Sequence, residues 1–356
     1  MLRRAVLILL GIIPVFLVCE ISARLFYTPM LHMAANIIYF PCFQKGTYYW
    51  FSVRPYCSGT NSMGLRGPEI SKEKPAGTKR ILVAGDSFAY GVGVDEADTF
   101  PRLLESSTSA EVVNAGVIAT EPGYYYLYLK NDGMKLHPDT VIVAFYPEND
   151  VFDFDNRFDV QWRGEDAKGL PKKIVSDSSY VDASGYLLPN AFSLLQNPLV
   201  QKSYFLSYVT EKYIHVSKSS PQMNRVCLYK PRCRDLDAYK KNVKELFLGM
   251  KILTEEKGAK LLVVLIPSKF QIYPQTRFQF AILLPLSPDE LEYPQKEFDA
   301  FFQENHIAYL DLLPVFQAHA SEQTYLPTDT HWNALGHTIA ASAISEKIAS
   351  LQTEPE

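Results

Sequence analysis

Short apolar runs alternate with longer helical patterns along most of the chain, beginning near residue 79. The apolar runs are rich in Val, Ile and Leu, as the buried strands of parallel sheets are. They cover residues 81–84, 111–114, 140–145, 260–266 and 306–310. The helical patterns between and after them cover residues 99–106, 121–136, 236–257, 294–304 and 334–351. This alternation predicts an α/β fold with a mostly parallel sheet and helices on both of its faces.

Two segments interrupt the alternation. The first, at about residues 151–234, is polar and aromatic and is too long for a simple connection. It is expected to be either a cap over a site or a surface that binds a partner. The second, at about residues 271–293, carries Pro274, Pro285 and Pro288 and begins directly after a predicted strand. We expect this segment to border a site at the strand end.

The N-terminus has a different pattern. Arg3 and Arg4 precede an uninterrupted apolar stretch over residues 5–19, which Glu20 ends. As a helix this stretch is about 22 Å long, short of a hydrocarbon core of about 30 Å unless flanking apolar residues extend it. We favour an uncleaved signal anchor, with a cleaved signal peptide and a buried helix of a soluble domain as alternatives. The anchor would leave the rest of the chain extracytoplasmic, on the periplasmic side of the membrane.

These patterns divide the chain into three parts. Residues 1–28 are the predicted signal anchor and transmembrane helix, and residues 29–78 form an irregular N-terminal extension. Residues 79–351 form the α/β domain with its two insertions. The chain is 47% hydrophobic and 21% charged, as globular proteins are. Its net charge of −4 provides no electrostatic attraction for a phosphate backbone, so we expect no nucleic-acid partner.

Four of the five cysteines form two close pairs in the sequence. Cys42 stands near Cys57, and Cys227 stands near Cys233, in neither case with the spacing of a metal site. In an oxidising compartment each pair would close a small loop with a disulfide bond. The alternative is that all four are unrelated buried thiols.

A serine stands at the carboxyl end of the first predicted strand, where α/β enzymes hold their nucleophiles. It is Ser87, in the sequence Gly-Asp-Ser-Phe. A serine hydroxyl requires a neighbouring imidazole as its base, and a carboxylate to orient that imidazole. His331 and Asp329 fit these two roles, because they lie two residues apart just before the last predicted helix. For His337, six residues further on, we expect a packing role.

Acyl transfer also requires donors for the oxygen that becomes negative in the tetrahedral intermediate. The backbone N–H of Ser87 is one candidate. Gly116 follows the second predicted strand and would let a backbone N–H approach a ligand closely. Asn149 follows the third strand and can present a side-chain amide. We therefore expect Ser87, Gly116 and Asn149 to form the oxyanion hole.

Together these residues resemble a known family. The Gly-Asp-Ser-Phe sequence at Ser87, then Gly116, Asn149, and Asp329 with His331, resemble the four ordered motif blocks of the SGNH hydrolases, the GDSL-type esterases. The resemblance covers residues 79–351. Residues 60–66 are similar to a segment of membrane-anchored bacterial members.

One position departs from the common pattern. Many members carry the acid three residues before the histidine, where this chain has Thr328. The Asp-x-His-Trp form found here is similar to that of the alginate O-acetyltransferase-like branch. The resemblance implies a flavodoxin-like three-layer α/β/α sandwich and a two-step mechanism through an acyl-serine. It implies no metal and no other cofactor.

The residues and the resemblance favour an ester hydrolase that acts on acyl, especially acetyl, esters of small molecules or glycans in the cell envelope. Since the acyl-serine can also react with a sugar hydroxyl, an O-acyltransferase on an envelope polysaccharide is the first alternative. A non-catalytic anchored binding domain is the second, because fold alone does not fix function.

Overall fold

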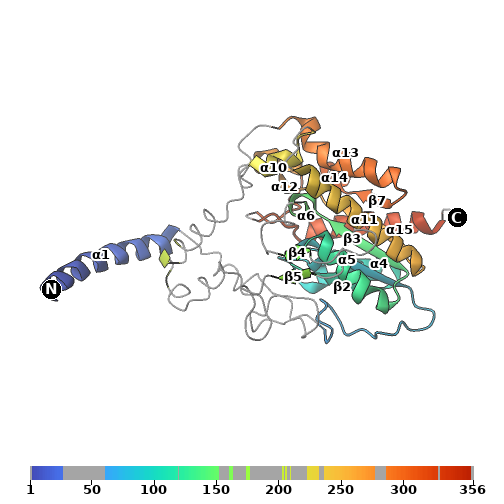
Figure 1. Cartoon of the computed structure of the whole chain (residues 1–356), viewed down its shortest axis with the longest axis horizontal. Coiled ribbons are helices and arrows are strands. Elements are labelled where there is room, and N and C mark those ends of the chain that lie inside the picture. The colour runs from blue at the N-terminus through green and yellow to red at the C-terminus, as the bar shows by residue number, and fades with distance from the viewer. Residues whose placement is uncertain are drawn as a thin grey trace. The chain divides into compact units, whose positions relative to one another are not determined.

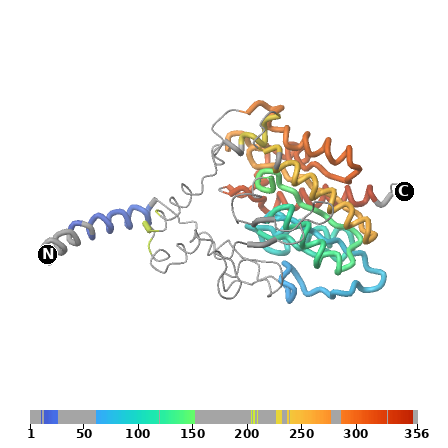
Figure 2. The backbone as a smooth tube through the Cα atoms, viewed as in Figure 1, coloured from blue at the N-terminus to red at the C-terminus, as the bar shows by residue number. Residues whose placement is uncertain are grey.

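The computed structural model contains the predicted α/β domain (Figure 1). Figure 2 traces the backbone through the chain. The residues that the structure describes are 2–26, 61–118, 120–151, 160–162, 174–176, 203, 205–206, 209, 223–231, 236–276, 286–327 and 329–353. The chain divides into two compact units, one made of residues 1–39 and 178–220, the other of residues 40–177 and 221–356.

The first unit contains the N-terminal helix α1 (Leu2–Phe26). Its Glu20 accepts hydrogen bonds from Ser203 Oγ at 2.7 Å and from the backbone N–H of Phe205 at 3.0 Å. Within the described residues, no helix is both long and apolar enough to cross a membrane. The predicted transmembrane helix at residues 1–28 is therefore not confirmed.

The second unit is built on a parallel five-stranded sheet in the order β2-β1-β3-β6-β7. Numbered along the chain, this is the 2-1-3-4-5 order of flavodoxin-like folds. All five predicted strands are confirmed. They are β1 (Arg80–Gly85), β2 (Glu111–Gly116), β3 (Thr140–Phe145), β6 (Lys260–Leu265) and β7 (Ala308–Asp311).

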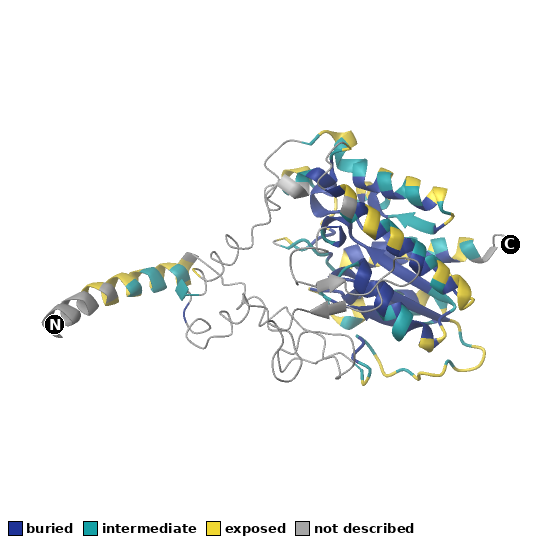
Figure 3. Ribbon diagram, in the orientation of Figure 1, coloured by how far each residue is buried: buried dark blue, intermediate teal, exposed yellow. Residues whose placement is uncertain are grey.

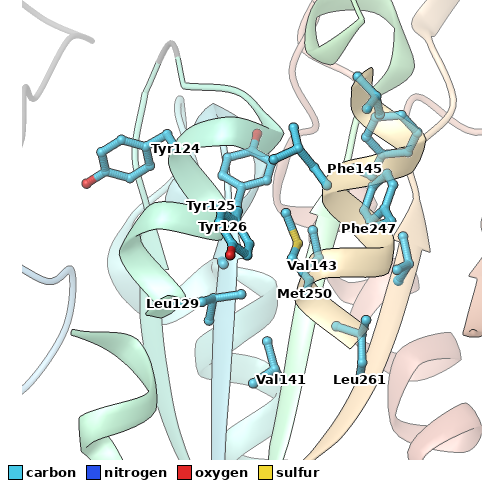
Figure 4. Close-up of a cluster of buried hydrophobic side chains, with 14 of the residues drawn as sticks. Tyr124, Tyr125, Tyr126, Leu129, Val141, Val143, Phe145, Phe247, Met250 and Leu261 are labelled. Atoms are coloured by element: carbon cyan, nitrogen blue, oxygen red, sulfur yellow. The ribbon is translucent and has the colours of Figure 1, made fainter. Parts of the chain in front are cut away.

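One face of the sheet is covered by three helices, α5 (Pro122–Asn131), α11 (Asp237–Glu256) and α13 (Pro288–Glu304). Alternate strand residues point to this face, as the two-residue period of a strand requires. Figure 4 shows the cluster, in which side chains of β3 lie between α5 and α11. The labelled members are Tyr124, Tyr125, Tyr126, Leu129, Val141, Val143, Phe145, Phe247, Met250 and Leu261.

The other face is covered by α3 (Ser87–Tyr90), α4 (Phe100–Thr108), α14 (Leu313–Ala318) and α15 (Ala334–Thr353). The intervening strand residues, such as Val83 and Ile142, are fully buried against these helices. The central strands are thus buried on both faces, whereas the outer faces of the helices are exposed (Figure 3). These two clusters make the domain the predicted three-layer sandwich.

The predicted helices are confirmed with two changes of boundary. The helix expected at residues 294–304 begins earlier, at Pro288, because Ser287 and Glu290 form a capping box and Pro288 occupies its first turn. The helix expected at residues 121–136 ends at Asn131, and a 3₁₀ turn, η2 (Gly133–Leu136), follows it.

The described parts of the first insertion are short. They are the antiparallel pair β4 (Val160–Trp162) and β5 (Ile174–Ser176), four single positions of the first unit, and the helix α10 (Met223–Leu228). The second insertion starts within α12 (Lys269–Ile272) and ends within α13. Whether either insertion caps a site stays a prediction.

Cys227 of α10 is buried and disulfide-bonded. Cys42, Cys57 and Cys233 lie outside the described residues, so the predicted pairings stay predictions. Cys19 is a free thiol.

Candidate active site

Ser87 lies two residues beyond β1, at the first position of α3. Asp86 caps this helix, since its Oδ1 accepts the backbone N–H of Phe88 at 2.8 Å. The preceding Gly85 has no room for a side chain, because an added Cβ would lie 2.8 Å from Ala89 Cβ and 2.9 Å from Ala144 Cβ. The turn from strand to helix is therefore tight, and it leaves Ser87 at the carboxyl edge of the sheet.

This edge is also where the strand order reverses. β1 lies between β2 and β3, and the chain passes to opposite sides of β1 to form them. Parallel α/β sheets bind their ligands at such a switch point. Gly116 pairs with Gly85 in the register of β1 and β2, and Asn149 follows β3 on α6 (Pro147–Asp150). The fold thus gathers three of the predicted motif blocks at one edge.

The imidazole of His331 lies beside the hydroxyl of Ser87. His331 Nε2 is 2.7 Å from Ser87 Oγ, although the two residues are 244 positions apart in the sequence. His331 Nδ1 makes a hydrogen bond with Asp329 Oδ1, which also accepts the backbone N–H of His331 at 2.9 Å. The structure therefore brings the three predicted residues together in the order hydroxyl, imidazole, carboxylate. Their catalytic role is argued below as a proposal.

The carboxyl of Asp329 is held in its ionised form. Partial burial raises its pKa, but the hydrogen bond and charge of His331 outweigh burial and lower the pKa to about 2. An ionised carboxylate accepts a hydrogen bond from Nδ1–H, and this leaves Nε2 of a neutral imidazole free to accept the Ser87 proton. Ser87 is buried, as are Asp86 and Phe88 on either side of it, whereas the side chain of Asp329 is 39% exposed.

Aromatic side chains pack near the imidazole of His331. The rings of Phe88 and His331 lie with their centroids 5.0 Å apart, and the ring of Trp332 packs edge-on against Phe88, also at 5.0 Å. The ring of Phe316 stacks on the ring of Trp332, with their centroids 5.0 Å apart. The residues next to Ser87 and His331 thus form one buried aromatic cluster beneath the two reactive groups.

His337 has the packing role expected for it. It is 1% exposed, and its Nδ1 accepts the backbone N–H of Phe100 at 3.2 Å. Burial, reinforced by the positive charge of Arg66, lowers the pKa of His337 to about 3. The ring is therefore neutral at physiological pH and serves as a hydrogen-bond acceptor within the core.

Asn149 lies on α6 beside the first turn of α3, and one hydrogen of its side-chain amide is already used in a hydrogen bond. Its Nδ2 donates to Asp86 Oδ2 at 2.8 Å, so Asp86 connects α6 to the first turn of α3. A side-chain amide carries two N–H groups. The second hydrogen of Asn149 is the one that the predicted oxyanion role requires.

Gly116 has a clear steric function. An added Cβ would lie 2.3 Å from the backbone nitrogen of Tyr90, so only glycine lets the end of β2 approach α3 this closely. Its N–H donates to Asn114 Oδ1 at 2.9 Å. To serve an oxyanion this N–H would have to exchange partners, and that role stays a prediction.

The sequence did not indicate the polar group that fixes α6. Asp150, fully buried, accepts the N–H of Tyr146 at 2.9 Å and the hydroxyl of Tyr125 at 3.0 Å. Burial and the nearby charge of Asp86 raise the pKa of Asp150, against the effect of these two hydrogen bonds. Tyr125 lies 25 positions from Asp150, so no local signal in the sequence could have paired the two.

Arg66 holds the other end of α3. Its guanidinium donates to the carbonyl oxygens of Tyr90 at 2.7 Å, Gly91 at 2.6 Å and Val94 at 2.8 Å. Arg66 belongs to the predicted segment at residues 60–66, so this segment fixes the helix that begins with Ser87. Within the described residues, no group of three or more His, Cys, Asp or Glu side chains is arranged to hold a metal ion.

The C-terminal third of the chain matches a known family. Residues 233–356 match the model of the family described as "SGNH hydrolase-like domain, acetyltransferase AlgX". The matched range includes Asp329 and His331, whereas Ser87, Gly116 and Asn149 lie before it.

Two curated relatives carry the name "Probable alginate O-acetylase AlgJ". The chain is 33% identical over 115 residues to that of Pseudomonas syringae pv. tomato (strain ATCC BAA-871 / DC3000), a match that covers 31% of this chain and 28% of the relative. It is 30% identical over 105 residues to that of Pseudomonas putida (strain KT2440), which covers 29% and 26%. The chain thus spans less than a third of the length of either relative.

Solved structures with some likeness include a GDSL-like lipase from Bacteroides thetaiotaomicron VPI-5482. It has 10% sequence identity and a TM-score of 0.37, over 77% of this chain and 89% of the lipase. The acetyl xylan esterase AlAXEase has 13% identity and a TM-score of 0.40, over 76% and 98%. Likenesses of this size support no argument about activity.

Proposed function

We propose that this chain, whose residues 233–356 match a family described as SGNH hydrolase-like, is a serine acyl-transfer enzyme that moves an acetyl group onto a hydroxyl of an extracytoplasmic polysaccharide. The observation that carries the proposal is the 2.7 Å contact of Ser87 Oγ with His331 Nε2, with Asp329 on the other ring nitrogen. A hydroxyl, a base and an orienting carboxylate in this order are what nucleophilic acyl transfer requires.

In the first step Ser87 Oγ attacks the carbonyl carbon of the acetyl donor while its proton passes to His331 Nε2. The tetrahedral intermediate then collapses, the bond to the leaving oxygen breaks, and that oxygen takes the proton from Nε2. The products are an acetyl-Ser87 ester and the free hydroxyl of the donor. Asp329 stabilises the imidazolium that exists between the two proton transfers.

In the second step His331 Nε2 takes the proton of an incoming hydroxyl, whose oxygen attacks the acetyl-serine carbonyl. The Ser87 oxygen leaves and recovers the proton from Nε2, so the enzyme returns to its initial state. In both steps the negative oxygen of the intermediate requires donors. We assign this role to the backbone N–H of Ser87 and the second amide hydrogen of Asn149.

A polysaccharide acceptor is supported by the two relatives, which are named as alginate O-acetylases. An extracytoplasmic location is supported by the disulfide bond of Cys227 and by Arg3 and Arg4 before the apolar stretch. The acceptor of this chain is therefore proposed as a class, a hydroxylated envelope polysaccharide, rather than as one polymer.

Ester hydrolysis is the second candidate, because the same acetyl-serine reacts with water if water reaches it. The His331 side chain is 18% exposed, so the base of the second step is accessible to solvent. The two candidates share Ser87, His331 and Asp329 and differ only in the acceptor.

One experiment tests both candidates. The purified protein is incubated with p-nitrophenyl acetate, with and without oligomannuronate, and the products are analysed by mass spectrometry. Acetylated oligosaccharide supports transfer, whereas free acetate as the sole product supports hydrolysis. Ser87→Ala should lower release of p-nitrophenol at least about a thousandfold. Equal release by the wild type and the alanine variant would overturn the proposed function.

A further inference from the structure

Lys269 makes an unusual set of contacts near the site. It is the first residue of α12, four positions beyond the end of β6, and it is 4% exposed. Its Nζ donates to the backbone oxygens of Leu326 at 2.7 Å, Pro327 at 2.8 Å and Asp329 at 3.1 Å. All three acceptors belong to the loop that carries Asp329 and His331. An ammonium has three N–H groups, so this number of carbonyls can use all of them.

The base of this loop is held by other contacts. Tyr325 and Trp332 form an antiparallel bridge, and the N–H of Leu326 donates to the carbonyl of His331 at 2.9 Å. The hydroxyl of Tyr325 donates to the carbonyl of Pro267 at 2.7 Å. These contacts fix where the loop leaves and rejoins the domain.

The tip of the loop has less support from packing. Pro327 is exposed, and the Asp329 side chain is 39% exposed. Burial therefore does not fix the carboxylate that orients His331. Lys269 instead holds the backbone of this loop, because it donates to the carbonyl oxygens of Leu326, Pro327 and Asp329.

Burying an ammonium is costly unless its hydrogen bonds are satisfied. Burial lowers the pKa of Lys269, and the charge of Asp329 acts in the opposite direction. An apolar side chain would fill this space without that cost, but it would leave the three carbonyls without these donors. The buried ammonium of Lys269 therefore stabilises the backbone of the loop that carries Asp329 and His331.

We propose that Lys269 is a positioning residue, which holds the loop of Asp329 and His331 so that the imidazole meets Ser87. The inference rests on the proposed function, since it assigns Lys269 a part in the same acyl transfer. Lys269 acts through the backbone of this loop, because its Nζ donates to three of the loop's carbonyl oxygens. A displacement of the acid and base by about 1 Å is enough to lower the rate about a hundredfold.

The test compares Lys269→Met with Lys251→Met. Lys251 is the matched control, because its Nζ donates to the backbone oxygen of Asn305 at 2.8 Å, in a contact that supports no residue of the site. For each variant we would measure kcat and KM with p-nitrophenyl acetate, the rate of Ser87 labelling by a fluorophosphonate, and the melting temperature.

We expect Lys269→Met to lower kcat and the labelling rate by about 10- to 100-fold, with KM within about twofold of the wild-type value. Lys269→Arg should restore part of the loss, because a guanidinium can also donate to several carbonyls. Lys251→Met should keep the wild-type kcat. If Lys269→Met does not melt cooperatively, Lys269→Gln replaces it and is judged by the same criterion.

A folded Lys269→Met protein with wild-type kcat and labelling rate would overturn the positioning role and leave the proposed function intact. Loss of kcat by an equal factor in Lys251→Met would also overturn it, because the effect would then reflect general stability. If the wild type itself is no more active than Ser87→Ala, the proposed function fails and the positioning role fails with it.

Discussion

Phe88 and Trp332 pack edge-on, with their ring centroids 5.0 Å apart. Phe88 directly follows the proposed nucleophile in the sequence, and Trp332 directly follows the proposed base. Phe88 also lies 5.0 Å from the ring of His331. The two reactive side chains are thus brought together by the packing of their neighbours, and not by their own hydrogen bond alone.

Replacing Phe88 with leucine should therefore affect catalysis more than stability. The change keeps an apolar side chain but removes the ring beneath His331, so we expect kcat to fall about tenfold with a stability cost of about 1 kcal/mol. Phe316→Leu is the control, since Phe316 stacks on Trp332 in the same cluster. Steady-state kinetics and thermal melts would check this, and equal kcat losses in both variants would contradict it.

Asp329→Asn should lower kcat by about 10²- to 10⁴-fold, because an amide can hold the wrong imidazole tautomer. The hydrogen bond and charge of His331 outweigh burial and lower the pKa of Asp329 to about 2, so the wild-type carboxylate is ionised at both pH 5 and pH 8. The loss should therefore be measured at pH 8, by steady-state kinetics with p-nitrophenyl acetate. A variant with wild-type kcat would contradict the orienting role of Asp329.

Asp311, at the end of β7, provides a test of stability against pH. Burial raises its pKa from 3.8 to about 7, opposed by the N–H of Leu313 and reinforced by the charges of Asp299 and Glu292. Because the folded protein binds this proton more tightly than the unfolded chain, stability is full below about pH 3.8 and falls as the pH rises through 7.

The variant Asp311→Asn removes this charge and can still accept the Leu313 N–H. Its melting temperature should exceed that of the wild type by a few degrees at pH 8, and the difference should vanish near pH 4. Asp289→Asn is the control, because the Asp289 side chain is 95% exposed on α13. The prediction is wrong if the two variants respond alike to pH.

Gly116→Ala should destabilise the domain by about 1 to 3 kcal/mol, since the new methyl group would meet the backbone of Tyr90 and Ala89. Gly11→Ala, where an added Cβ has nothing within 4 Å, should change stability little or favourably. Chemical denaturation of both variants would check this. A Gly116→Ala protein as stable as the wild type would show that α3 can move away from β2.

Sequence alone predicted the strands and singled out the three side chains that the structure brings together. Each strand is a local apolar run, and Ser87, Asp329 and His331 stand beside elements that local patterns predict. Helix boundaries were less certain. Pro294 suggested a helix start, but the capping box at Ser287 begins α13 at Pro288, six residues earlier, and Pro294 lies inside the helix.

The supporting contacts could not be predicted in the same way. Lys269 lies 57 to 60 positions from the carbonyls it binds, and Asn149 lies 63 positions from Asp86. Nothing in the neighbouring residues of either side chain signals its partner. Such pairs depend on the sheet order, which places the ends of β1, β3 and β6 side by side.

The distance of 244 positions between Ser87 and His331 has a consequence for biosynthesis. A nascent chain carries the serine long before the imidazole and its carboxylate leave the ribosome, because Asp329 and His331 come much later in the sequence. During most of translation and any export that accompanies it, the serine is therefore an ordinary, unreactive alcohol.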